Sequence, residues 1–168
     1  MKILVFILVF ILFQVKIISQ ENNCETDSLV RLIETLDLSG TNDEFVLSLL
    51  DSAFQVIEKE NLSVLESIVE LGKRSDGYVS SYLGFGFGSL LINEFDKYVE
   101  LISQLNEKDQ ELIGRFAFYM DGGGMNIEDY DKVEIKLEKL NKSNSQLMSQ
   151  LAKIHLKLLQ KIKSESLE

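Results

Sequence analysis

The sequence contains no proline and no tryptophan, and it has one cysteine and one histidine among 168 residues. Average usage would give a chain of this length several prolines, so their absence favours helices that run without interruption. Because Cys24 is the only cysteine, an intramolecular disulfide is excluded, and this residue is either a free thiol or an intermolecular link. His155 alone does not make a histidine-cysteine zinc site. Histidine is also the most common general base in enzymes, and this chain has it at one position only.

Residues 1–20 have the layout of a secretory signal peptide, because Lys2 precedes an apolar run over residues 3–13 and polar residues follow up to Gln20. The apolar run is shorter than the roughly 20 residues that cross a bilayer. Retention as an uncleaved anchor is the alternative. We therefore expect an exported protein, periplasmic or secreted after cleavage, with membrane contact only through an uncleaved N-terminal segment.

Acidic residues dominate the charge, and the formal net charge is −10. Cleavage of the leader would remove two lysines and make the mature chain more acidic still. Such a field disfavours nucleic acid and favours a basic protein partner. Residues 132–168 depart from this pattern, with eight lysines against four glutamates. We expect an acidic helical body over residues 21–122, then a C-terminal helical hairpin over residues 123–168 that packs on the same domain.

Apolar residues recur with the 3.6-residue period of amphipathic helices along most of the chain. Thr41 and Glu44 form a capping-box pattern, Asn61 precedes a further helix as its cap, and Gly72 marks that helix's end. The expected fold class is all-α, with short antiparallel helix pairs that stack as a HEAT-like array or a compact helical bundle. This likeness to HEAT-type α-solenoids concerns packing and not activity.

Residues 76–95 are predicted to form the central packing helix, because they are apolar on nearly every face. Ser80, Gly84 and Gly88 would stack four residues apart as a packing ridge, along which a neighbouring helix could approach closely. Glycine and phenylalanine also alternate here, which is the pattern of a strand. We favour the helix, since the chain shows no pattern for a partner strand.

Two groups of residues are weighed as sites. Four aromatic side chains could line a small apolar ligand pocket, with core packing as the alternative; they are Tyr78, Tyr82, Phe85 and Phe87. Three carboxylates near a glycine run form a weak metal candidate, for calcium; they are Asp121, Asp129 and Asp131. Their spacing does not fit an EF-hand, and an acidic helix N-terminus explains the same residues. No cofactor is expected, because Ser89 interrupts the glycine pattern of dinucleotide loops.

These observations favour a non-enzymatic, exported protein that binds a basic protein through its acidic helical face. An immunity or inhibitor module in a bacterial envelope is one concrete version. A second hypothesis is that a cavity around Gly84–Gly88 binds a small apolar ligand. An enzyme is the third hypothesis, because paired carboxylates are plentiful but fall on polar helix faces.

Overall fold

The structure is a computed structural model that describes residues 26–39, 41–57, 59, 61–75, 77–118 and 127–165. The predicted leader at residues 1–20, Cys24 and the glycine run at 122–124 lie outside these ranges. The described residues form α-helices and no strand, which confirms the all-α fold class. Within the same residues, no helix has the length and apolar character needed to cross a membrane.

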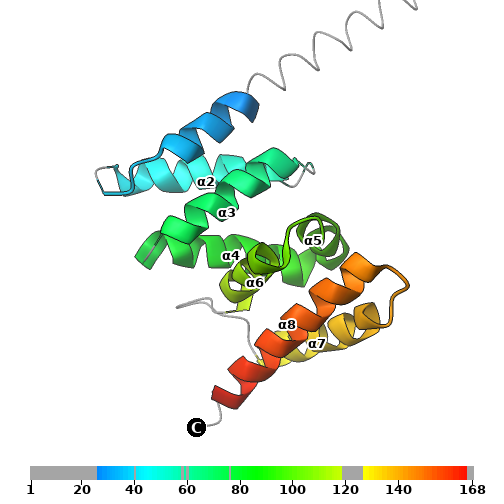
Figure 1. Cartoon of the computed structure of the whole chain (residues 1–168). Coiled ribbons are helices and arrows are strands. Elements are labelled where there is room, and N and C mark those ends of the chain that lie inside the picture. The colour runs from blue at the N-terminus through cyan, green and yellow to red at the C-terminus, as the bar shows by residue number, and fades with distance from the viewer. Residues whose placement is uncertain are drawn as a thin grey trace, which may run out of the picture.

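A helix over residues 26–35 comes first in the described part of the chain. The helices that follow are α2 (Asp43–Ile57), α3 (Leu62–Arg74), α4 (Gly77–Asn93), α5 (Phe95–Ile102), α6 (Glu107–Phe118), α7 (Ile127–Asn141) and α8 (Gln146–Glu165). Figure 1 shows the helix over 26–35 with α2 and α3 at one end of the molecule and α7 with α8 at the other. Between the two ends lie α4, α5 and α6.

Helix α4 is the packing centre of the fold. It contacts α2, α3, α5, α6 and α7. Its buried side chains include Val79, Leu83, Phe87 and Leu91, which follow one another at four-residue spacing along the helix. The strand alternative for this stretch is therefore wrong. Burial against several neighbours offsets the cost of glycines inside a helix, which is about 1 kcal/mol each.

The ends of α2 and α3 differ from expectation in two places. The side chain of Asn42, not Thr41, accepts a hydrogen bond from the Glu44 N–H at 2.8 Å and begins α2. Thr41 instead donates its hydroxyl to the Asp37 carbonyl. Asn61 caps α3 as predicted, by accepting from the Val64 N–H at 3.2 Å.

The predicted end of α3 at Gly72 is wrong, because the helix continues to Arg74 and ends at Ser75. Gly72 is buried inside it, where a Cβ atom would lie 2.7 Å from the ring of Phe116 on α6. This glycine therefore permits close packing between two helices rather than a turn.

Helices α7 and α8 lie against each other at the end of the chain. Lys163, near the end of α8, contacts Asp131 at 2.7 Å and Glu134 at 2.5 Å, both on α7. At the opposite end, the Ser149 hydroxyl donates to the Asn141 carbonyl at 3.0 Å. The two helices therefore run in opposite directions. Helix α8 also packs on α5 and α6, and HEAT-like stacking of the whole chain stays a prediction.

Candidate functional site

Aromatic and acidic side chains alternate on the surface that α2 and α4 share. Tyr78 lies beside Asp43, and the hydroxyl of Tyr82 donates to Asp51. Phe85 lies one turn further along α4, and its side chain is 61% exposed. We call these five residues the α2–α4 face. They bring three of the four predicted aromatic site residues onto one surface.

The hydrogen bond to Asp51 fixes the orientation of the Tyr82 ring. The carboxylate of Asp51 and partial burial raise the pKa of Tyr82 to about 12, so this tyrosine keeps its proton at neutral pH. Partial burial, with a further contribution from Asp43, raises the pKa of Tyr78. The hydroxyl of Tyr82 therefore stays a hydrogen-bond donor to α2, while Tyr82 is half-buried and Tyr78 is 39% exposed.

The hollow beside the α2–α4 face is small. Its volume is about 170 Å³, and its lining includes Asp51, Tyr82, Phe85 and Glu94. Sites for small molecules usually have volumes of about 300–1,000 Å³ and mostly apolar walls. The fourth predicted residue, Phe87, is fully buried and packs edge-on against Phe54 with 5.2 Å between ring centroids. Phe87 is part of the core.

The three residues of the packing ridge predicted for α4 are buried or half-buried. Gly84 and Gly88 are buried, and Ser80 is half-buried with its hydroxyl 3.0 Å from that of Ser75. The tightest approach involves Gly86, where a Cβ atom would lie 2.2 Å from the ring of Phe54 on α2. Sequence reasoning missed Gly86, because the pattern does not say which flank of α4 faces α2.

The single histidine lies in the core between α5, α6 and α8. His155 is fully buried, and its Nε2 atom is 2.7 Å from the hydroxyl of Tyr98. Its ring packs edge-on against Tyr98 and Phe118. Burial lowers the pKa of His155 to about 4, although the Leu151 carbonyl near the ring acts in the opposite direction. Nδ1 forms no well-aligned hydrogen bond. His155 is a neutral packing residue at pH 7.

The predicted metal candidate falls partly outside the described residues, since Asp121 is not among them. Asp129 forms an ion pair with Lys132 at 3.2 Å, and Asp131 forms one with Lys163 at 2.7 Å. In the described part of the chain, no three histidine, cysteine or acidic side chains are grouped as metal ligands. Each of these two aspartates is therefore paired with a lysine.

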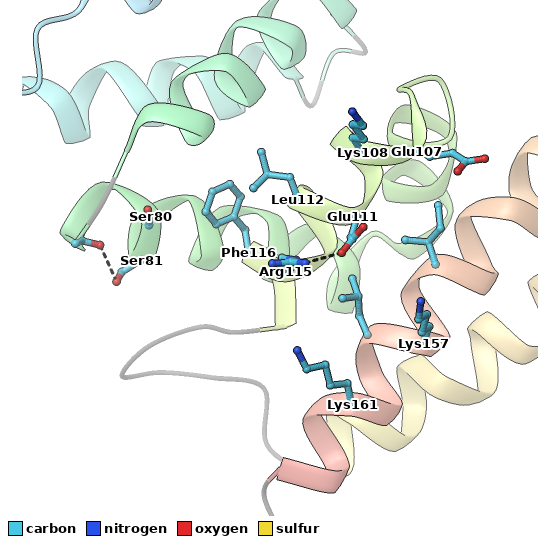
Figure 2. Close-up of a pocket in the computed structure, with 13 residues that line it drawn as sticks. Ser80, Ser81, Glu107, Lys108, Glu111, Leu112, Arg115, Phe116, Lys157 and Lys161 are labelled. Carbon is cyan, nitrogen blue, oxygen red and sulfur yellow. Dashed lines mark hydrogen bonds and ion pairs between the residues drawn. The ribbon is translucent and has the colours of Figure 1, made fainter.

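A larger groove, of about 1060 Å³, opens between the start of α4, one side of α6 and one side of α8 (Figure 2). We call it the α4–α6–α8 groove. Apolar side chains on two helices line it, namely Leu112, Phe116, Ile154 and Leu158. Basic side chains on the same two helices line it as well, namely Lys108, Arg115, Lys157 and Lys161. Sequence reasoning did not identify this groove, because α6 and α8 are far apart in the chain.

The acidic side chains that line the α4–α6–α8 groove neutralise only part of the charge of its basic side chains. Glu107 and Glu111 are the carboxylates of the groove lining. Arg115 contacts Glu111 at 2.6 Å, and this hydrogen bond lowers the pKa of Glu111, with help from Lys157 and Lys161. Among the described residues, Lys108 and Lys157 take part in no ion pair at 4.0 Å or less. The groove is thus locally basic on an acidic molecule.

Comparison of the chain with protein-family models, with curated proteins and with solved structures gave no match.

Proposed function

We propose that this is an exported, non-enzymatic protein that binds a basic protein through the α2–α4 face. The observation that carries the proposal is the exposed aromatic group between carboxylates. Tyr78 is 39% exposed and Phe85 is 61% exposed, on a surface that also holds Asp43 and Asp51. Exposed aromatic rings with fixed orientation are typical of the residues that contribute most to protein–protein binding.

Charge supports a basic partner. The net charge of −10 would attract a positively charged protein at long range and raise the association rate. At short range, the carboxylates of Asp43 and Asp51 would meet lysine or arginine side chains next to the rings. An immunity or inhibitor module of a bacterial envelope fits this description, because an acidic helical surface can cover the basic active-site cleft of a target enzyme.

The non-enzymatic part of the proposal is supported by the position of His155. This side chain is fully buried and hydrogen-bonded to Tyr98, so it faces neither the α2–α4 face nor the α4–α6–α8 groove.

The alternative, a small apolar ligand held around Gly84–Gly88, has less support. The hollow at this place measures only about 170 Å³ and has carboxylates in its wall.

A capture experiment tests the proposal. The tagged protein would be incubated with an envelope extract of the cells that produce it, eluted stepwise with salt, and the eluates identified by mass spectrometry. We expect one basic protein, released by moderate salt because screening weakens the charge attraction. The same capture with Phe85→Ala should lose this protein.

The matched control for this capture is Ile135→Ala, since Ile135 on α7 is 68% exposed and lies outside the α2–α4 face. Capture of the same protein by wild type and by both variants would contradict the assignment of the face. A specific hydrolase or transferase activity of the purified protein, lost on substitution of one acidic pair, would contradict the non-enzymatic part.

A further inference from the structure

The α4–α6–α8 groove has the opposite charge to the rest of the molecule and is not used by the proposed protein-binding function. Four basic and two acidic side chains line it, whereas the whole chain carries a net charge of −10. Two of the cations, Lys108 and Lys157, make no ion pair in the described part of the chain. We propose that this groove binds a single-chain amphiphile with an anionic head group, such as a long-chain carboxylate.

The apolar part of the groove would hold the chain of the ligand. Leu112 and Phe116 on α6 line the groove together with Ile154 and Leu158 on α8, and the two helices pack against each other. All but Leu158 are only half-buried, so they keep apolar surface in contact with water. Covering such surface contributes about 25 cal/mol per Å². A volume of about 1060 Å³ is at the upper end of small-molecule sites.

The cations would hold the head group. Figure 2 shows Arg115, Lys157 and Lys161 around the same opening, next to the apolar side chains. Arg115 is already bonded to Glu111 at 2.6 Å, and Lys161 forms an ion pair with Glu165 at 3.7 Å. Of these three cations, only Lys157 forms no ion pair in the described residues. A carboxylate or sulfate beside Lys157 would add a negative charge to a groove in which four basic side chains outnumber Glu107 and Glu111, which favours binding.

The surrounding acidity favours a small anion over a large one. An acidic protein or an anionic bilayer would place many negative charges opposite the whole acidic surface, within roughly the 8–10 Å over which charges act at physiological salt. A single-chain monoanion inside the groove meets only the local excess of cations. The occupant we infer is therefore a monomeric amphiphile.

Fluorescence displacement tests this inference with the purified protein. The probe is a dansylated undecanoic acid, and the competitors are dodecanoate, dodecanol, dodecyltrimethylammonium and inorganic phosphate, each below the concentration at which it aggregates. We expect saturable binding of the probe and displacement by dodecanoate at a concentration at least about tenfold lower than by dodecanol. The cationic amphiphile and phosphate should not displace it.

Substitutions on α6 and α8 locate the site. Lys157→Gln together with Arg115→Gln should weaken probe binding at least about tenfold, the change that corresponds to 1.4 kcal/mol. Lys153→Gln changes an exposed lysine of the same helix outside the groove lining and should leave binding unchanged. Circular dichroism and the thermal midpoint would show that each variant is folded, since all three side chains are exposed.

Several results would overturn the inference. These are equal displacement by dodecanol and dodecanoate, displacement by phosphate alone, and equal weakening of binding by Lys153→Gln and by the double variant. Binding to vesicles of an anionic phospholipid without binding of the monomeric probe would also overturn it, in favour of a membrane surface. The outcome is independent of the α2–α4 face, because Phe85→Ala leaves the groove lining intact.

Discussion

At the scale of single residues, His155 makes the fold sensitive to acid. Its pKa is lowered by burial to about 4 in the folded protein, against an ordinary value of 6.5. Between these two pH values the unfolded chain binds a proton that the folded chain does not. Stability therefore falls as the pH decreases from about 6.5 to about 4, by about 3 kcal/mol in total, and is constant with respect to this group above pH 6.5.

Chemical denaturation at a series of pH values measures this effect. The free energy of unfolding of the wild type should decrease between pH 6.5 and 5, a range above the ordinary pKa of carboxyl groups. In His155→Phe the same range should be flat, although the variant should be less stable at pH 7 because the buried hydroxyl of Tyr98 loses its partner at 2.7 Å. Equal pH slopes in the two proteins would show that His155 is not the group responsible.

The glycines show which features of the fold could be predicted from the sequence and which could not. The pattern correctly predicted that α4 is a helix, but it did not predict that one flank of this helix, with Tyr78 and Phe85, is exposed. It did not identify Gly72 and Gly86 as points of close approach, where Phe116 and Phe54 leave no room for a Cβ atom. Such contacts depend on rings from α6 and α2, whose rotamers and helix positions a local pattern does not contain.

At the scale of elements, periodicity predicted the helices and their approximate order, while their ends depended on competing polar side chains. Asn61 had no competitor and was predicted correctly. At the start of α2, Thr41 and Asn42 both suit the cap position, and the hydroxyl of Thr41 is bonded to Asp37 instead. The α4–α6–α8 groove was not predictable, because it requires the side-by-side packing of α6 and α8.

Arg74 ties the helix over residues 26–35 to the rest of the molecule. Its guanidinium group donates to the carbonyls of Leu36 at 2.6 Å, Ile33 at 2.7 Å and Glu34 at 3.2 Å, at the end of that helix. The last carbonyls of a helix have no N–H partner four residues further on, although that of Ile33 also accepts a bond from the Leu36 N–H at 3.4 Å. Arg74→Met should therefore lower the free energy of unfolding by about 1–3 kcal/mol and speed hydrogen exchange over residues 26–35.

Arg31→Met is the matched control, because Arg31 is an exposed arginine on the same helix and forms no ion pair in the described part of the chain. Arg31→Met should change neither the free energy of unfolding nor the hydrogen exchange over residues 26–35 appreciably. Similar exchange rates for wild type and Arg74→Met, measured by mass spectrometry, would mean that apolar packing alone holds this helix in place.

At the scale of the whole molecule, charge is divided between two surfaces. The α2–α4 face combines exposed rings with carboxylates, and the α4–α6–α8 groove combines apolar side chains with cations. Composition predicted the acidity and the lysine-rich C-terminal segment, but not that α8 lysines meet Lys108 and Arg115 of α6 in one groove. The two surfaces involve different residues, so substitutions can separate their functions.

The dissociation constant of the captured basic partner tests the central claim most directly. It would be measured by titration calorimetry for wild type, Phe85→Ala and Ile135→Ala, at about 50 mM and about 500 mM salt, conditions between which the screening length falls severalfold. We expect Phe85→Ala to weaken binding at least about tenfold, Ile135→Ala to have no effect, and salt to weaken binding of all three proteins. Equal dissociation constants for the two variants, or binding insensitive to salt, would contradict a charge-assisted interface on the α2–α4 face.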